Sequence, residues 1–206
     1  MWTDVQVANK ALARIGVHRQ LSSLTDGSSE AAAVNEALDR CKDALLAAHH
    51  WSWATLRADL GLVATYVEGS GLPGWTYVYD LPAGFATAIE IWPGPHRPAA
   101  SERVPFALGI GTDKTSTRPM LFTDEEEPTL LYVPSIYPTA YAPAVADDAL
   151  AWALAAELAM VLTQKAELSA HLSARAERAL QVAIAHDRNG QQLAPEPEPC
   201  FITARY

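Results

Sequence analysis

The stretch Ala149–Leu162 limits the possible folds of this chain more than any other, because it is apolar on nearly every side. Leucines recur every four residues, alanines fill most of the remaining positions, and Glu157 is its one charged residue. A helix that is hydrophobic all round is buried among other elements. We therefore expect a central helix over residues 147–164, with Trp152 and Leu158 in the core.

Three further segments have helical periodicity, at residues 3–16, 29–50 and 166–187. The first opens with a capping box, in which Thr3 caps the first turn and the side chain of Gln6 reaches back to it. The other two carry apolar residues on one face and charged residues on the other. Together with the central helix, these segments predict a helical bundle.

Two tryptophans, Trp51 and Trp53, stand between the second of these helices and the first β-like segment. Each buried tryptophan removes about 150–250 Å² from water. We expect the pair to anchor the β region on the helices, as part of a core that also includes Leu60. The preceding His49 and His50 are adjacent, so they would point in different directions on a helix and make a poor metal site.

From Leu60 onward the helical periodicity fades, and Gly, Pro, Tyr, Val and Thr become common. Strands are indicated at residues 76–82 and 86–92, the first of which places Leu81 in the core and ends at a proline. Weaker strand patterns follow at residues 104–108, 119–123 and 129–133. We expect a small antiparallel β region, inserted at about residues 60–135.

The run Asp124–Glu127 holds four consecutive acidic residues. It lacks the ligand spacing and glycine-assisted turn of a calcium loop, and glycosidase chemistry needs two carboxylates at a set separation. We interpret it as a solvated hairpin tip. The glycine-rich segment Gly109–Thr115 lacks the spacing of a phosphate-binding loop, and no helical pattern follows it, so we expect an ordinary loop there.

The last sixteen residues, 191–206, differ from the rest in composition. Alternating prolines and glutamates form an extended spacer, which ends in an apolar and aromatic tip. A stiff spacer with such a tip suggests an arm that docks on a partner, and a frayed terminus is the alternative. The candidate contact residues are Pro199, Phe201, Ile202 and Tyr206.

The composition excludes some classes of function. A net charge of −9 argues against a nucleic-acid-binding surface, because phosphate contacts need clustered Lys and Arg. The longest apolar run is shorter than the ~18 residues of a membrane span. The two cysteines, Cys41 and Cys200, have no ligand spacing and fit a reducing cytosol. We expect no metal site, no cofactor and no catalytic residue.

The fold class expected is α+β. It consists of a mainly α-helical bundle with the small β insertion, in a single domain over residues 1–190, followed by the extended arm.

The order of these pieces resembles the head-to-tail adaptor, or tail tubular protein A, family of short-tailed phages and gene-transfer particles. The matching pieces are Val7–Gly16 with Leu21–Leu24 and Glu30–Ala31, then Trp51–Leu60, then Tyr77–Pro82, then Ala149–Ala159 with the helix from Leu168. No single motif is specific, but their order and spacing together carry the resemblance.

The resemblance implies a structural virion protein without enzymatic activity, in which residues 1–190 form the adaptor domain. Such a protein assembles as a homo-oligomeric ring, of about twelve copies by that resemblance, under the portal protein. The ring extends the DNA channel, lets DNA pass without specific binding, and is the platform for the tail nozzle protein. Its arm lies along the portal. It is made in the bacterial host cytoplasm and ends at the head–tail junction of the virion.

Two other functions remain open at this point. One is a tail-associated peptidoglycan hydrolase that uses carboxylates such as Glu125 or Glu127, although no motif supports such a pair. The other is a cytosolic helical interaction module with no connection to phages.

Overall fold

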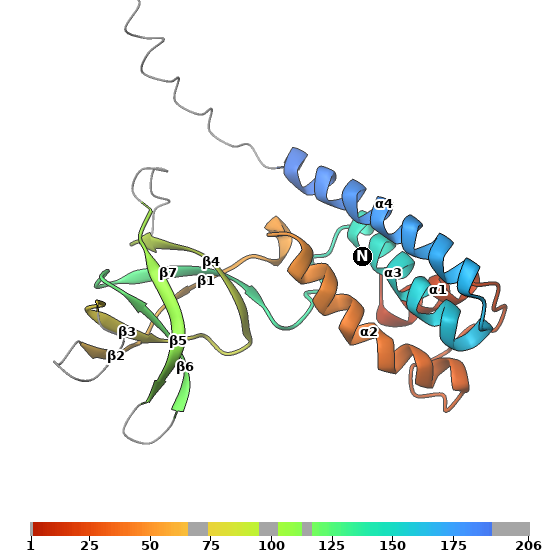
Figure 1. Cartoon of the computed structure of the whole chain (residues 1–206), viewed down its shortest axis with the longest axis horizontal. Helices are drawn as coiled ribbons and strands as arrows, with labels where there is room; N and C mark the ends of the chain where they lie inside the picture. The colour runs from red at the N-terminus through yellow and green to blue at the C-terminus, as the bar shows by residue number, and fades with distance from the viewer. Residues whose placement is uncertain (1, 66–73, 95–102, 113–116, 191–206) are drawn as a thin grey trace, which may run out of the picture.

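The computed structural model describes residues 2–65, 74–94, 103–112 and 117–190, which form a helical lobe and a β lobe side by side (Figure 1). The helices are α1 (Asp4–Arg14), α2 (Ser29–Ala48), α3 (Ala144–Thr163) and α4 (Ala166–Gly190), with a short 3₁₀ helix η1 (Ser52–Ala54). The strands are β1 (Leu56–Asp59), β2 (Leu62–Thr65), β3 (Tyr77–Asp80), β4 (Phe85–Pro93), β5 (Phe106–Thr112), β6 (Thr117–Thr123) and β7 (Pro128–Pro134). Along the chain, the seven described strands therefore lie between the helix pair α1 and α2 and the helix pair α3 and α4.

The helical lobe begins with the capping box read from the sequence, which the structure confirms. The Gln6 amide N–H donates to Thr3 Oγ1, and the Thr3 amide N–H donates to Gln6 Oε1 at 2.8 Å. Ser28 caps α2 in the same way, since its hydroxyl accepts from the amide of Ala31. These caps satisfy N–H groups that a helix start leaves unpaired.

Helix α3 lies against α1, α2 and α4 and is the centre of this lobe (Figure 1). It begins at Ala144, three residues before the position expected from the sequence. Its leucines at 150, 154 and 158 are at most 1% exposed, and its alanines allow the neighbouring helices to approach closely. The last turn is different, because Met160 and Val161 are 52% and 65% exposed.

The β part corrects the expected fold class. A mainly helical bundle with a small β insertion was wrong, because the chain forms two antiparallel sheets, one of three strands in the order β1-β7-β4 and one of four in the order β2-β3-β6-β5. The two sheets enclose a core of their own, which consists of Tyr79, Ile91, Leu121, Leu130 and Tyr132. The β region is therefore a lobe with its own hydrophobic core, not a small addition to the bundle.

The two strands missed from the sequence are β1 and β2, each of four residues. Both are edge strands, and the described side chains of β1 are mostly exposed, so they lack the alternation that marks a half-buried strand. The partner of β1 is distant in the chain, since β1 pairs with β7 and Leu56 lies opposite Tyr132, whereas β2 pairs with the next strand, β3. Pairing with a neighbouring strand of the sheet, rather than a local sequence pattern, defines these two strands.

The expected loop at Gly109–Thr115 is also corrected, because residues 109–112 belong to β5. They pair with β6, with Gly111 opposite Arg118. A β-carbon at Gly111 would lie 2.4 Å from Met120 Sδ, so the glycine leaves room for the buried methionine side chain. Glycine inside a strand often marks such a close approach.

The acidic run Asp124–Glu127 is not a hairpin tip. It joins β6 of one sheet to β7 of the other, and these two strands do not pair with each other. The Tyr79 hydroxyl donates to the backbone carbonyls of Glu125 and Glu126, and Asp124 Oδ1 accepts from the amide and hydroxyl of Thr76. The run is thus a fixed connection between the two sheets.

Candidate functional site

A chain of aromatic rings lies between α2 and the segment that leads into α3. The ring of Trp51 is 5.1 Å from that of His49 and 5.6 Å from that of Trp53, and Trp53 is 5.5 Å from Tyr137 (centroid distances). Trp51 is fully buried, and its indole N–H donates to the carbonyl of Leu45 at 2.7 Å. Trp53 is half-buried and packs against the same core. The pair therefore fixes the start of the β lobe on the helical core.

Asp187, on the last turns of α4, holds the start of η1. Its carboxylate accepts from the Ser52 amide at 3.2 and 3.3 Å and from the Ser52 hydroxyl at 2.6 Å. His49 Nε2 lies 3.3 Å from the second carboxylate oxygen. Because Asp187 is 5% exposed, these contacts form in a largely water-excluded place. They connect the C-terminal end of α4 to the link between the lobes.

A second buried carboxylate, Asp147, lies in the first turn of α3. It accepts from the backbone N–H of Trp2 at 2.8 Å and from the hydroxyl of Tyr137 at 3.4 Å. Burial raises the pKa of Asp147, and these hydrogen bonds oppose the shift. Burial and the neighbouring carboxylate raise the pKa of Tyr137. The sequence predicts only that a helix begins at Asp147, and no local pattern shows its contacts with Trp2 and Tyr137.

Trp152 is half-buried on the surface shared by α3 and α4. The guanidinium of Arg14 stacks 3.7 Å from its ring, and its indole N–H donates to Asp148 at 3.1 Å. Arg14 also forms an ion pair with Asp148. Trp152 thus borders the core, whereas Leu158, one turn and a half further along α3, lies fully inside it.

Leu60 and Leu81, expected in the same core as the tryptophans, belong to the other lobe. Both are half-buried and pack against the core between the two sheets. The buried Tyr79 lies in that core, and burial, with Tyr77 and Glu126 nearby, raises its pKa to about 12. The six expected core residues are therefore divided between two separate cores.

The expected arm contacts, Pro199, Phe201, Ile202 and Tyr206, lie outside the described residues. Glu125 and Glu127, the carboxylates considered for hydrolysis, lie in the connection between the sheets. In the described part of the chain, no three His, Cys, Asp or Glu side chains are grouped so that they could hold a metal ion. None of the helices described is long and apolar enough to cross a membrane.

Large apolar side chains are exposed on both lobes and on the segment between them. On the segment between β7 and α3, Ile136 and Tyr141 are each 75% exposed. The others are Leu56, Leu62, Leu108 and Ile110 on the β lobe and Met160, Val161 and Val182 on the helical lobe. These side chains are candidates for contact with partner proteins or other copies.

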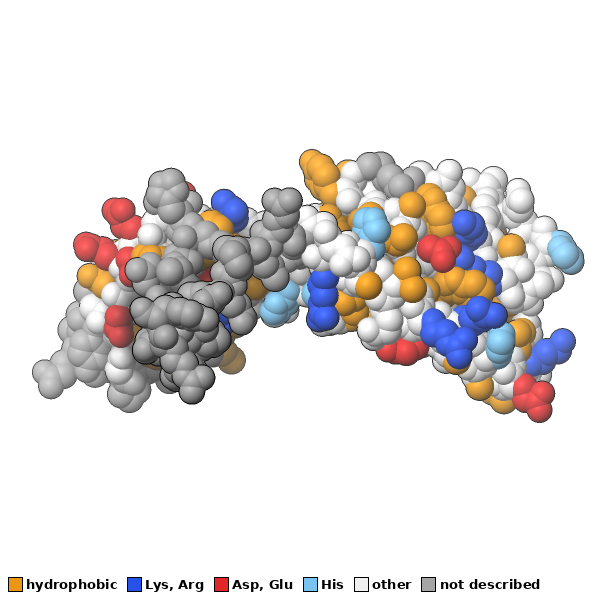
Figure 2. Space-filling view, turned by 90° about the horizontal axis from the view of Figure 1, so that it is seen from above, with side chains coloured by type: hydrophobic (Ala, Val, Ile, Leu, Met, Phe, Trp, Pro, Cys, Tyr) orange, Lys and Arg blue, Asp and Glu red, His pale blue; other side chains and the backbone are white. Residues whose placement is uncertain are grey.

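Charge is unevenly distributed over the two lobes. In Figure 2, Asp and Glu side chains are seen on both lobes, and the helical lobe also shows a group of Lys and Arg side chains among apolar ones. Arg175 and Arg178 of α4 are both exposed.

No protein-family model matches the sequence, and a search of curated proteins finds no match.

Proposed function

We propose that this chain is a structural virion protein, a head-to-tail adaptor that assembles as a ring under the portal protein. In this role it extends the DNA channel and provides the platform for the tail. The proposal rests on the order of motifs along the chain, from the capped first helix through the Trp-Ser-Trp stretch to the alanine- and leucine-rich helices. The protein would be made in the bacterial host cytoplasm and incorporated at the head–tail junction.

The structural observation that carries the proposal is the exposed apolar surface on both lobes. Ile136 and Tyr141, at 75% exposure, lie where the chain passes from the β lobe to the helical lobe. Side chains this exposed are free to contact another copy, and a ring made from head-to-tail contacts covers surface on two sides of each subunit. A ring of identical copies therefore gives these side chains a role that a monomer does not.

The charge of the chain is compatible with DNA passing through such a ring. The net charge is −9, and the β lobe carries acidic side chains on the face seen in Figure 2. An acidic wall repels phosphate, so DNA would slide past it without being held.

The test is a native mass measurement of the full-length protein, alone and mixed with the portal protein from the same genome. A large complex of fixed stoichiometry that includes the portal protein supports the adaptor. A monomer that ignores the portal protein overturns it. A peptidoglycan-release assay on the same sample tests the hydrolase, which predicts release that is lost when Glu125 and Glu127 are replaced by glutamine.

A further inference from the structure

The surface between α3 and α4 has a hollow of about 240 Å³ with a basic rim. Four apolar residues, Val145, Trp152, Ala179 and Val182, line it together with Asp148. Asp148 is already engaged by Arg14 and by the indole N–H of Trp152. The hollow therefore offers an apolar groove whose one carboxylate is neutralised.

Two arginines, Arg175 and Arg178, complete the lining of this hollow. Both are exposed, and no ion pair is found for either among the described residues. They lie three residues apart on one face of α4, about 4.5 Å along the helix axis. Two carboxylates two residues apart in a polyproline helix are about 6 Å apart along its axis, a spacing that the two long arginine side chains can reach.

The chain itself contains such a pair of carboxylates in its last sixteen residues. Glu196 and Glu198 are the two acidic residues of this arm, and they alternate with prolines. We propose that the arm folds back along α4 of its own chain, so that these two glutamates pair with Arg178 and Arg175.

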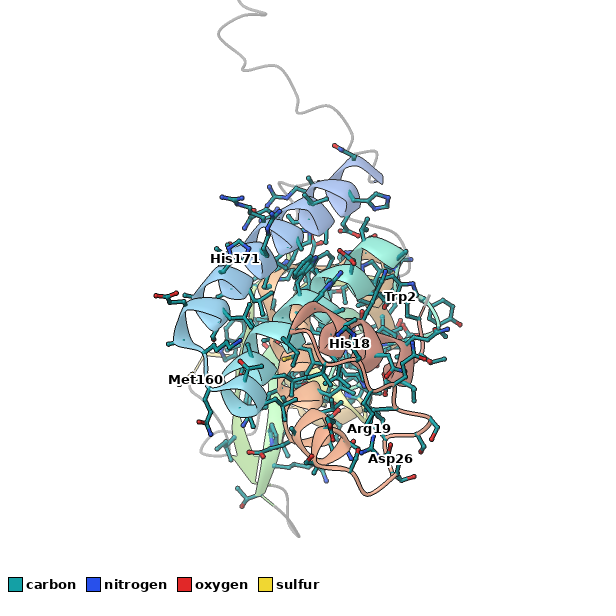
Figure 3. All side chains as sticks on the ribbon, turned by 90° about the vertical axis from the view of Figure 1, so that its right-hand side faces the viewer. Trp2, His18, Arg19, Asp26, Met160 and His171 are labelled. Carbon is teal, nitrogen blue, oxygen red and sulfur yellow. The ribbon has the colours of Figure 1, made fainter. Side chains whose placement is uncertain are left out.

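The length of the arm fits this arrangement. Helix α4 rises about 18 Å from Arg178 to Gly190, and the six residues from Gly190 to Glu196 span about 19 Å when extended. On the same count, Phe201 reaches the first turn of α4, which follows the last turn of α3 with its exposed Met160 and Val161. Figure 3 shows Met160 and His171 on the same side of the helical lobe, where α3 and α4 lie. The arm thus places its acids on the arginines and its apolar tip on exposed apolar side chains.

This contact belongs to the free protein and is independent of the adaptor function. If that function holds, the portal protein must displace the arm from α4 before the arm can lie along the portal.

The experiment uses the full chain labelled with ¹⁵N and a nitroxide spin label on Cys200. Cys41 is buried, and burial raises the pKa of its thiol to about 11, so labelling is selective for Cys200. The proposal predicts loss of amide signals around the α3–α4 connection and along the first half of α4, with the β lobe unaffected. The loss should decrease as salt screens the ion pairs.

Charge reversal provides the controls. The double variant Arg175→Glu/Arg178→Glu should restore the signals, and adding Glu196→Arg/Glu198→Arg should bring the loss back. The variant Arg19→Glu/Arg188→Glu makes the same change in charge at exposed positions outside the hollow, and it should behave as the wild type.

Two results would overturn the proposal. The first is an absence of signal loss near α4, or a loss spread evenly over both lobes. The second is signal loss in ¹⁵N-labelled, unlabelled-thiol protein mixed with spin-labelled ¹⁴N protein, which would show that the arm binds another copy. Neither result depends on the portal protein, so failure here leaves the adaptor proposal standing.

Discussion

At the scale of the residue, Trp51 connects the helical core to the start of the β lobe. Trp51→Ala is expected to lower the free energy of unfolding by about 3–5 kcal/mol, as for other buried aromatics. The change opens a cavity and also removes the donor to the Leu45 carbonyl. Urea unfolding followed by far-ultraviolet circular dichroism measures the loss. The matched control is Trp53→Ala, which should cost less because its ring is half-buried, and equal losses would contradict this ranking.

Tyr79 makes the stability of the β lobe sensitive to alkaline pH. Its folded-state pKa is about 12, above the ordinary value of 10.0, so the unfolded chain loses the phenolic proton first. The stabilisation is therefore complete below pH 10 and is lost as pH rises toward 12.

We expect Tyr79→Phe to lose about 1 kcal/mol at neutral pH, because the hydroxyl no longer donates to Glu125 and Glu126. The variant should also lose less stability than the wild type between pH 10 and 11.5. Unfolding midpoints across that range test both expectations. Parallel curves for the two proteins would show that Tyr79 is not the group responsible.

The sequence identifies core residues better than it identifies buried carboxylates. Trp51 and Leu158 were expected in the core from residue type and periodicity, and both are fully buried. Asp147 and Asp187 are polar by type, and a local pattern places them at helix ends. Their burial depends on partners 145 and 135 residues away in the chain, Trp2 and Ser52, which no local pattern shows.

At the scale of the element, the contact between α4 and η1 depends on Asp187. Asp187→Ala leaves the Ser52 amide without its acceptor in a water-poor place, so we expect a loss of about 2–3 kcal/mol. Hydrogen exchange should also increase at the amide of Ser52. Asp187→Asn retains one acceptor oxygen and should lose less. An unchanged exchange rate in the alanine variant would show that the contact does not hold η1.

The helices of this chain can be predicted from local sequence to a greater extent than its sheets. The capping box at Thr3 and the leucine spacing in α3 are local features, and they predict helices that begin within a few residues of the observed ones. The sheets depend on pairings such as Arg57 with Leu131, far apart in the chain. Five strands were recognised because each has a local β pattern, whereas β1 and β2 are short edge strands without one, and the division into two sheets depends on the pairings alone.

At the scale of the whole molecule, the exposed side chains between the lobes should matter for assembly and not for folding. Ile136→Asp and Tyr141→Asp are expected to change the free energy of unfolding by less than about 0.5 kcal/mol, since both side chains are 75% exposed. The same variants should lose the complex with the portal protein in native mass measurements, because a charge would be buried in the interface. Normal assembly by both variants would place the contacts on another surface.

The last prediction concerns the arm, residues 191–206, and separates its role from that of the folded lobes. A chain that ends at Gly190 should keep the circular dichroism spectrum and unfolding midpoint of the full chain, because the described cores contain no residue beyond that point. It should bind the portal protein more weakly. A full-length variant with Phe201, Ile202 and Tyr206 replaced by serine keeps the length and the glutamates of the arm. If the apolar tip makes the contact, this variant should bind as weakly as the truncated chain. Failure of the truncated chain to fold would assign the arm to the core, and undiminished binding by both proteins would assign portal attachment to the lobes.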